Sequence, residues 1–344
     1  MDVSLRRSFL SGLRAVTVVA LLAVTTGCGL LIDAVQWIQP IPTDEVQTIC
    51  LRKRVQVGIS VEPLRPFVFP AVFTDEGVRI TGMDVEVIRA MVDALSRECS
   101  GATIEPVLHL VRFRDLFVLL NEGKLDFFVS TITVNLPHAA RSGLAYSNPY
   151  FLDGGLGGLT RDTALAARIS THFASGQNGI DRARARQAFA GLTLAVQEGT
   201  SAELYVRDVL KDSRLLLCDS LPAAFETRTP PIDIILGKLP VLRYEAATVR
   251  KEWTLLRRDA DTPLRLTREY FGITTAEENY RLRSLLNHEL YVLEEAGRLA
   301  DMKRRWFDEV YAYPRRAALE GLPFAVEDMP AHYDQGECRF DSGH

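Results

Sequence analysis

The sequence has little of several residue types, and each shortage argues against a class of protein. Only five of its 344 residues are cysteines, too few for a small disulfide scaffold, and no two form a Cys-x-x-Cys pair. The six histidines show no metal-ligand spacing, so we expect no metal site. The net charge of -4 is the opposite of the basic excess typical of nucleic-acid binders, so we expect no nucleic-acid partner.

Long apolar runs and glycine-rich cofactor motifs are also scarce. One long uncharged stretch exists, at the N-terminus, and this excludes a multi-span membrane protein. The segment GGLGGL at 154–159 has neither the Gly-x-Gly-x-x-Gly spacing nor the lysine of a phosphate-binding loop. We interpret it as a flexible crossing between two lobes and expect no cofactor. What is present is a globular composition, 47% apolar and 24% charged, in a chain whose length favours two domains.

The N-terminus has the composition of an export signal. Arg6, Arg7 and Arg14 precede an uncharged run at 15–32, which is the order of a basic and an apolar segment in a signal peptide. The paired arginines, followed by Ser-Phe-Leu, are also similar to the twin-arginine export motif. We therefore predict that residues 1–27 are an export signal. Its removal changes the net charge from -4 to -6, because it contains three arginines and one aspartate.

A cysteine near the end of this run predicts a lipid anchor. Thr-Gly-Cys at 26–28 is similar to the lipobox of bacterial lipoproteins, although Thr25 stands where leucine is usual. We expect Cys28 to be lipidated, residues 28–49 to form a tether, and the protein to be periplasmic and anchored to the membrane. The alternatives are an uncleaved signal anchor, since 18 uncharged residues just span a bilayer, and cleavage without lipidation.

An extracytoplasmic location makes disulfides possible. Cys50, Cys99, Cys218 and Cys338 remain beside the predicted lipidation site, and they allow three pairings among which the sequence does not choose. Because Cys50 opens the first predicted strand and Cys99 closes the helix after it, Cys50–Cys99 is the pair that we favour.

Strands and helices alternate through the middle of the chain. The predicted strands lie at 54–59, 125–130, 192–197 and 232–236, and the predicted helices begin at 82, 116, 202, 223 and 275. This alternation favours an α/β fold with a largely parallel sheet. We expect a helical excursion at 162–189 that is rich in Ala and Arg, a second crossing at 265–273, and a polar surface tail at 314–344.

Five segments, in the same order, resemble extracellular solute-binding protein family 3, the periplasmic amino-acid-binding proteins of ABC transporters. Together they cover about residues 52–310, and five separate matches are more specific than any single motif. They are VQVGISVEPLRPFVF (55–69), GMDVEVIRAMVDAL (82–95), FRDLFVLLNEGKLDFFVSTIT (113–133), AYSNPYF (145–151) with LAVQEGTSAELY (194–205), and EEAGRLADMKRRWF (294–307).

The resemblance implies a type II periplasmic-binding-protein fold, an α/β fold of two lobes joined by two crossing strands. Lobe 1 would comprise 50–154 and 274–313, lobe 2 would comprise 155–273, and 314–344 would be a C-terminal tail. Family members close on a small molecule in the cleft and pass it to a membrane permease. The implied function is therefore capture of a small polar solute for an ABC uptake system, by a monomer without enzymatic activity.

The resemblance also implies ligand-binding residues. In the family, hydroxyl groups after a buried strand meet the ligand carboxylate, and Ser130, Thr131 and Thr133 hold those positions. Thr200 and Ser201 match the turn of the second lobe, where amides at a helix N-terminus attract the same carboxylate. For both groups the alternative is ordinary capping of a turn or helix.

Two other family positions match less well. Phe113 falls on the position of an aromatic ring that flanks the ligand, with core packing as the alternative, but Leu64 occupies the second aromatic position. The family arginine that binds a carboxylate bidentately falls on His138 or Ala140, depending on the direction of counting. The neighbouring Arg141 is our candidate for this role, and a solvated surface arginine is the alternative.

Lys238 is the clearest departure from the family. An aspartate in this position, after the buried strand at 232–236, pairs with the ligand α-ammonium in family members. A lysine in a closing cleft would repel an ammonium group. Either the ligand is not an ordinary α-amino acid but an organic acid or other anion, or Lys238 points out of a degenerate site. We favour the anion.

Two other classes of function remain as alternatives. The fold also resembles periplasmic cyclohexadienyl dehydratases, whose chemistry needs a general acid. Glu62 and Glu198 are the candidates, but exposed loop residues are the simpler interpretation of both, and no catalytic triad or carboxylate pair is visible. The third class is an extracytoplasmic sensor or accessory protein that keeps the fold but has a degenerate cleft.

Overall fold

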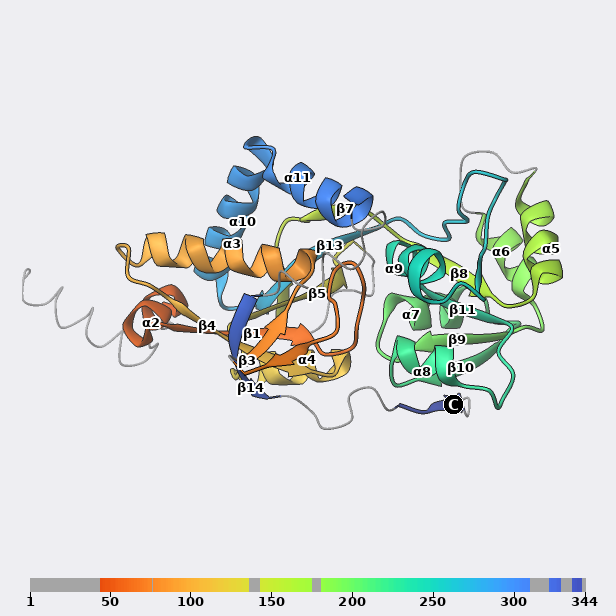
Figure 1. Ribbon diagram of the computed structural model, residues 1–344, viewed down its shortest axis with the longest axis horizontal. Coiled ribbons are helices and arrows are strands. Elements are labelled where there is room, and N and C mark those ends of the chain that lie inside the picture. Colours follow the sequence, from red (N-terminus) through yellow and green to blue (C-terminus); the bar gives the residue numbers. More distant parts are fainter. Residues whose placement is uncertain are drawn as a thin grey trace, which may run out of the picture. The chain divides into compact units, whose positions relative to one another are not determined.

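The computed structural model describes most of the chain from residue 44 onward. The described residues are 44–75, 77–135, 143–174, 181–309, 322–328 and 336–341. The predicted export signal, Cys28 and Arg141 lie outside them. The described part is built around two β-sheets, each with helices packed beside it (Figure 1).

The first sheet has nine strands in the order β2-β3-β14-β4-β1-β5-β13-β6, and β7 also pairs with β13. β1 lies between β4 and β5 and is parallel to both, so the carboxyl ends of these three strands meet at one edge of the sheet. Every residue of β5 is buried, as expected for a central strand with both faces covered. The strands are β1 (Arg54–Ser60), β2 (Val72–Thr74), β3 (Gly77–Ile80), β4 (Glu105–Val111), β5 (Phe127–Thr133), β6 (Leu144–Tyr146), β7 (Phe151–Gly154), β13 (Glu269–Ala276) and β14 (Leu322–Asp328).

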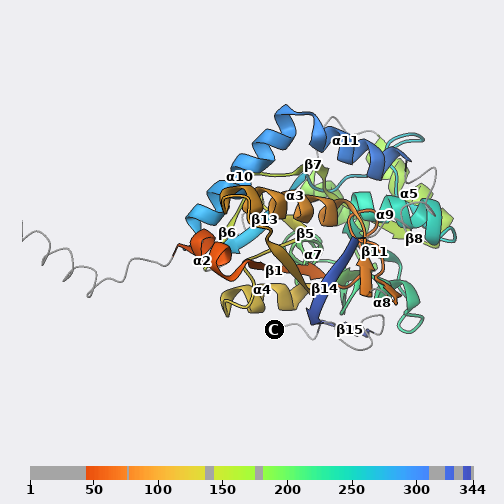
Figure 2. The ribbon, with the colours of Figure 1, turned by 60° about the vertical axis from the view of Figure 1, so that its left-hand side comes forward.

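Helices pack on both sides of this sheet. Figures 1 and 2 both show α3, α10 and α11 together on one side of the strands and α4 on the other. The amphipathic helix α3 buries Val87, Ile88 and Met91, which recur at helical spacing. The helices are α2 (Glu45–Arg52), α3 (Met83–Glu98), α4 (Phe113–Asn121), α10 (Tyr280–Glu295) and α11 (Arg298–Arg304), and the π-helical turn η2 (Arg305–Glu309) follows α11.

Helix α2 begins inside the segment predicted as a tether. Val46 and Ile49 are buried in the core, because the short helix packs on α3 and α10. A disulfide joins Cys50 in α2 to Cys99 at the end of α3, which is the pair that the sequence favoured. Residues 45–49 are therefore part of the folded unit instead of the tether.

The second sheet has six strands in the order β12-β8-β11-β9-β10-β15. β9 is parallel to β10 and β11, and helices α7, α8 and α9 follow β9, β10 and β11 in turn. The N-termini of these helices therefore lie at the carboxyl edge of the sheet. The strands are β8 (Leu156–Thr160), β9 (Thr193–Gln197), β10 (Arg214–Cys218), β11 (Ile234–Lys238), β12 (Thr254–Leu255) and β15 (Cys338–Phe340). The helices are α5 (Thr163–Ala174), α6 (Arg182–Phe189), α7 (Ser201–Asp208), α8 (Leu221–Glu226) and α9 (Leu239–Tyr244), with the π-helical turn η1 (Glu245–Val249) after α9.

The segment predicted as a polar surface tail contributes one strand to each sheet, so this prediction is wrong for its described residues. β14 pairs with β3 and β4 in the first sheet, and Figure 1 shows it in dark blue beside strands from the start of the chain. β15 pairs with β10 in the second sheet, and a disulfide joins Cys338 to Cys218 on the paired strand. The reason is the sequence LPFAVED at 322–328, whose apolar residues suit a strand.

The predicted crossings at 154–159 and 265–273 lie against each other at Gly154 and Glu269, but residues 156–159 belong to the buried strand β8 and are not a flexible crossing. β7 ends at Gly154, which pairs with Glu269 at the start of β13. At the next residue, Gly155, a Cβ atom would lie 2.3 Å from the carbonyl oxygen of Thr267, so only glycine allows this approach. The Thr267 hydroxyl accepts a hydrogen bond from the backbone N–H of Leu156 at 2.9 Å. Glu269 is therefore held beside both connections between the sheets.

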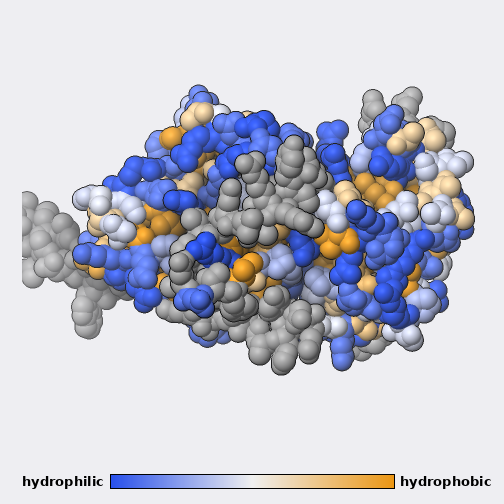
Figure 3. Space-filling model, viewed as in Figure 1, coloured by the Kyte–Doolittle hydropathy of each residue, from blue (hydrophilic) through white to orange (hydrophobic). Residues whose placement is uncertain are grey.

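The described surface is mainly hydrophilic on the face in Figure 3, where hydrophobic residues form small separate groups. Within the described ranges, no helix has the length and the apolar content needed to cross a bilayer.

Candidate functional site

Four side chains from both sheets meet in one buried cluster, which we call the Lys238 cluster. It consists of Thr133 at the end of β5, Ser201 at the start of α7, Lys238 at the end of β11 and Glu269 at the start of β13. The Oε2 atom of Glu269 accepts hydrogen bonds from Thr133 Oγ1 at 2.6 Å and from Ser201 Oγ at 3.0 Å. Lys238 Nζ lies 2.5 Å from the same oxygen. The sequence had predicted Thr133, Ser201 and Lys238 as ligand-binding residues.

Lys238 has no donor left for another partner within this cluster. Its ammonium group donates to the hydroxyls of Thr133 and Ser201 as well as to Glu269. An ammonium group has three N–H donors, so all three are used. Its Nζ atom also lies 5.0 Å from the ring centroid of Phe271, close enough for a cation–π contact.

The charge of Glu269 is stabilised although the residue is fully buried. The residue is 0% exposed, and burial alone would raise the pKa of its carboxyl group. The ammonium group of Lys238 and the hydroxyls of Thr133 and Thr267 outweigh burial, so the pKa of Glu269 is lowered below its ordinary value. Thr267 donates to Oε1 at 2.9 Å. The cluster thus contains an ionised carboxylate and an ammonium group in contact.

This pairing changes the interpretation of Lys238. The sequence predicted a lysine that either meets an anionic ligand or points out of the site. Its side chain is only 10% exposed and lies against Glu269, so it does not point out. Its charge is compensated by a carboxylate of the same chain, and an anionic ligand therefore no longer follows from Lys238 alone.

Ser130 and Thr131 lie next to the cluster on β5 and are buried, but they have different environments. The Ser130 hydroxyl has no hydrogen-bond partner among the described residues. Thr131 has a φ of +49°, which is strained for a β-branched residue. Its backbone N–H donates to Oδ2 of Asp84 at 3.1 Å, and Tyr150 donates its hydroxyl to Oδ1 at 2.7 Å. The pair formed by Asp84 and Tyr150 therefore supports the unusual backbone at this predicted site position.

Asp84 has a buried carboxyl group, and its hydrogen bonds to described residues come from neutral groups, the Thr131 N–H and the Tyr150 hydroxyl. Burial raises the pKa of Asp84 to about 7, although the hydrogen bonds from Tyr150 and Thr131 oppose the shift. The α3 N-terminus begins one residue earlier, at Met83, so Asp84 lies in its first turn.

Thr200 is used by its own turn in this structure. It is the N-cap residue of α7, but its hydroxyl donates to the carbonyl oxygen of Gln197 at 2.7 Å. Gly199 adopts a φ of +79° in the same turn, and its N–H donates to Glu203. Of the two residues predicted here, the structure brings only the side chain of Ser201 into the Lys238 cluster.

Phe113 packs in the core of the first sheet. It is 6% exposed, and its ring centroid lies 5.5 Å from that of Phe117 in an edge-to-face contact. Its backbone N–H donates to Glu62, which the sequence treated as an exposed loop residue. That treatment is wrong, because Glu62 is 1% exposed and burial raises the pKa of its carboxyl group despite the Ser60 hydroxyl bonded to it. Glu198, the other candidate acid, is partly exposed and pairs with Arg339 at 2.7 Å.

Sequence reasoning missed Glu269, Thr267 and Asp84. Glu269 lies in the predicted second crossing, and the signal for it was a lone acidic residue at the start of the apolar strand EYFGITTA. Such a residue needs a partner when it is buried, and Lys238 needed one as well. Pairing the two from sequence would have required the contact between β11 and β13, which neighbouring residues do not reveal.

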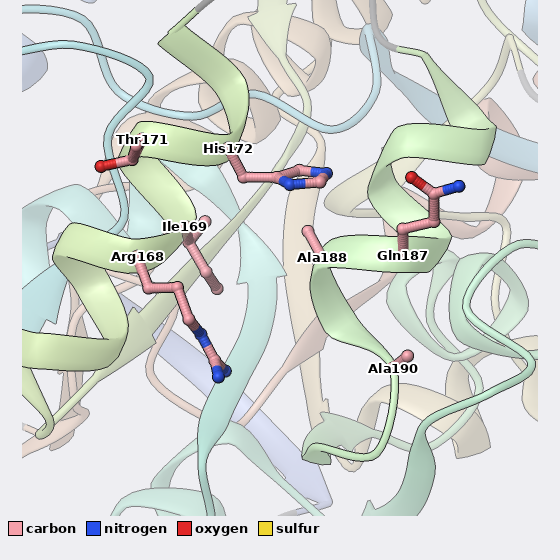
Figure 4. A pocket seen from close by; sticks show the side chains of 7 residues that line it. All are labelled: Arg168, Ile169, Thr171, His172, Gln187, Ala188 and Ala190. Atoms are coloured by element: carbon pink, nitrogen blue, oxygen red, sulfur yellow. The ribbon is translucent and has the colours of Figure 1, made fainter.

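A separate hollow lies within the predicted helical excursion. It has a volume of about 560 Å³ between α5 and α6 (Figure 4). None of the predicted ligand-binding residues lines it. The lining residues are Arg168, Ile169, Thr171, His172, Gln187, Ala188 and Ala190.

In the ranges that the structure describes, no three His, Cys, Asp or Glu side chains are grouped so that they could hold a metal ion.

Comparison with known proteins identifies relatives of most of the described chain. Residues 63–309 match the family model for bacterial extracellular solute-binding proteins, family 3. The arginine-binding periplasmic protein of Mannheimia haemolytica is 24% identical over 253 residues, which cover 72% of this chain and 90% of that protein.

Solved structures with the same fold point in the same direction. An amino acid ABC transporter substrate-binding protein from Streptococcus pneumoniae, bound to L-arginine, matches with a TM-score of 0.60 and 16% identity over 77% of this chain and 98% of its own. An ancestral amino-acid-binding protein, described as a precursor of cyclohexadienyl dehydratase, matches with a TM-score of 0.59 and 19% identity over 77% of this chain and all of its own.

Proposed function

The chain belongs to the bacterial extracellular solute-binding proteins, family 3, and from this membership we propose that it is the substrate-binding component of an ABC uptake system. A solute-binding role is common to the family. The predicted fold class is also confirmed, because the two sheets with their helices match solved structures of type II periplasmic binding proteins. The transporter and the identity of the solute are the parts that we propose.

The site of capture is the Lys238 cluster, and its solute carries a carboxylate group. The observation that supports this is the convergence of Thr133, Ser201 and Lys238, from three elements and both sheets, on a single carboxylate. Hydroxyl and ammonium donors in a buried place are the groups that a carboxylate ligand needs. An amino acid or an organic acid of similar size fits this chemistry.

Neighbouring groups support the same location. The buried Ser130 hydroxyl lies on the same strand as Thr133 and has no partner in the described part of the chain. A buried hydroxyl without a hydrogen bond costs on the order of 1–3 kcal/mol, so a polar solute that accepts or donates there would be stabilised.

The remaining parts of the proposal concern location and partners. We place the protein in the periplasm, held to the membrane by lipid on Cys28, where it would act as a monomer and deliver its solute to a membrane permease. Lobe 1 at 50–154 with 274–313 and lobe 2 at 155–273 would close on the solute, with Phe113, Thr131, Arg141 and Thr200 as further residues near it.

A thermal-shift panel tests this function. The purified protein would be heated with L-amino acids, dicarboxylates and sugar acids at millimolar concentration, with uncharged sugars as controls. A ligand that binds only the folded state raises the melting temperature by mass action. Stabilisation by one carboxylate-bearing class, and not by its amide or alcohol analogue, is the expected result. No shift with any member would contradict a solute-binding function at this site.

A second candidate function is an extracytoplasmic sensor or accessory protein with a cleft that takes no solute. The observation that favours it is Glu269, whose carboxylate already uses the donors of Thr133, Ser201 and Lys238. A panel without any stabilising solute, together with capture of a specific protein partner, would favour this candidate.

A dehydratase is a third candidate, because Glu62 is a buried carboxyl group with a raised pKa, as a general acid requires. Incubation with prephenate tests it, and turnover that is lost in Glu62→Gln would replace both binding functions.

A further inference from the structure

We propose that Glu269 is a built-in occupant of the solute carboxylate site, and that a solute enters by displacing it. This inference rests on the proposed function, because it concerns the same site. It assigns a role to a residue that the sequence did not identify as part of the site.

Glu269 is surrounded by the donors of the proposed solute site. Its carboxylate takes hydrogen bonds from Thr133, Ser201 and Lys238, the three residues of the proposed solute site that meet in this structure. All three bonds end on Oε2, and Thr267 donates to Oε1. The carboxylate therefore fills the place that these donors define.

All of these donors are already used in hydrogen bonds within the cluster. Lys238 uses its three N–H donors on Thr133, Ser201 and Glu269. The Thr133 and Ser201 hydroxyls each have one proton, and each donates it to Glu269. A second carboxylate at this place would lie against Glu269 and repel it. A solute carboxylate can therefore gain these donors only when the Glu269 side chain withdraws.

The charges of the pair match those of an amino acid. Lys238 and Glu269 together present an ammonium and a carboxylate in contact, which are the two charged groups of an amino-acid zwitterion. They come from different sheets, because β11 belongs to the second and β13 to the first. The pair thus links the two sheets through the same charged groups that a bound amino acid would use. Because a solute must compete with Glu269 for the donors, the strength of the pair sets the solute concentration that binding requires.

Chemical rescue tests this assignment. In Glu269→Ala the carboxylate is removed and the cluster keeps its donors, so a free carboxylate of similar length can take its place. Propionate at about 50 mM should raise the melting temperature of this variant by about 3 °C more than it raises that of wild type. Propionamide, which has the same shape without the charge, should give no such difference.

Two variants serve as controls. Asp212→Ala removes a carboxylate from the exposed Arg186–Asp212 pair, where water already solvates both groups, and it should show no rescue. The double variant Glu269→Ala/Lys238→Met should lose the rescue, because propionate then lacks its ammonium partner. Equal effects of propionate on Glu269→Ala, Asp212→Ala and wild type would overturn the assignment.

If Glu269→Ala does not fold with or without propionate, Glu269→Gln tests the assignment instead. It keeps the volume of the side chain and removes the charge that opposes an entering carboxylate. Propionate must then raise the melting temperature of Glu269→Gln by more than that of wild type, and equal shifts overturn the proposal. Rescue without any solute in the wild-type panel would keep Glu269 as the occupant of a carboxylate-binding place, but it would refute solute capture and with it the displacement step. A tightly bound solute without rescue would refute this assignment alone.

Discussion

Replacing Lys238 by methionine should destabilise the protein strongly, because the substitution leaves Glu269 buried without its cation. The two groups lie 2.5 Å apart, with side-chain exposures of 10% for Lys238 and 0% for Glu269. Methionine keeps most of the length and the apolar stem of lysine, so the change is mainly one of charge.

The magnitude follows from the distance and the burial. At 2.5 Å and an effective dielectric constant of about 20, the direct attraction is about 7 kcal/mol before desolvation is subtracted. The hydroxyls of Thr133, Ser201 and Thr267 remain and offset part of the loss. Removing one partner of a buried pair typically costs about 3–5 kcal/mol, and we expect Lys238→Met to fall in this range near pH 7.

The contribution of Glu269 to stability should depend on pH with opposite sign in wild type and in Lys238→Met. In wild type the pKa of Glu269 is lowered, so its contribution to stability is present above the ordinary value of 4.5 and is lost as the pH falls through the lowered pKa. In Lys238→Met burial acts without the cation and raises the pKa of Glu269. Its contribution is then present below 4.5 and is lost as the pH rises.

Urea unfolding between pH 4 and pH 8 measures both effects. Arg186→Met is the matched control, because it breaks an ion pair of similar length, 2.6 Å, in which both side chains are 50% exposed. We expect a large loss of unfolding free energy for Lys238→Met that grows with pH, and a small loss for Arg186→Met. A loss for Lys238→Met as small as that of the control, or one that shrinks as the pH rises, would refute a stabilising role of the buried pair.

Two other changes test separate parts of the structure. Cys338→Ser opens a loop with a sequence separation of 120 residues, so the chain-entropy model predicts a loss of about 5 kcal/mol in unfolding free energy. Limited proteolysis should then remove the C-terminal residues faster than in wild type. Cleavage at the wild-type rate would contradict a stabilising role of the disulfide that holds β15. Burial raises the pKa of Asp84 to about 7, so its contribution is present below 3.8 and is lost as the pH rises through 7. In wild type this effect lowers the unfolding free energy by on the order of 4 kcal/mol between pH 4 and pH 8, and Asp84→Asn should remove that decline in urea titrations. An unchanged dependence of the unfolding free energy on pH in Asp84→Asn would show that Asp84 is ionised at low cost.

Much of the fold could be predicted because local patterns determine it. The strand expected at 54–59 is β1 at Arg54–Ser60, and the helix expected from residue 82 is α3 at Met83–Glu98. In both elements the apolar residues recur at the period of the structure that they form. The pair Cys50–Cys99 was favoured for the same local reason, because the two residues bracket the first strand and the helix after it.

The C-terminal strands could not be predicted because their partners are distant in sequence. β14 pairs with β3 and β4, more than 200 residues earlier in the chain, and no local pattern reveals such distant partners. β15 has three residues, and its place depends on β10 and on the disulfide to Cys218. Proline and glycine spacing in this segment indicated a tail, while tertiary pairing decided the outcome.

The site was predictable in part for the same reason. Thr133, Ser201 and Lys238 each follow or begin a recognisable element, and the structure brings them together. Glu269 was missed because its role depends on the contact of two sheets, which no local period encodes. That one residue also changes the interpretation of Lys238, from a charge in the cleft that selects an anion to half of an internal pair.

Calorimetric titration tests the location of the solute site most directly. The best solute of the thermal-shift panel would be titrated into wild type, Ser130→Ala beside the Lys238 cluster and Thr171→Val in the hollow between α5 and α6. Each substitution removes one hydroxyl group. Because the Ser130 hydroxyl has no partner among the described residues, Ser130→Ala removes a hydrogen bond only from the complex with the solute. We predict that Ser130→Ala weakens binding about 10-fold, while Thr171→Val leaves the affinity unchanged. Unchanged binding in Ser130→Ala with lost binding in Thr171→Val would contradict the proposed location and place the site in the hollow.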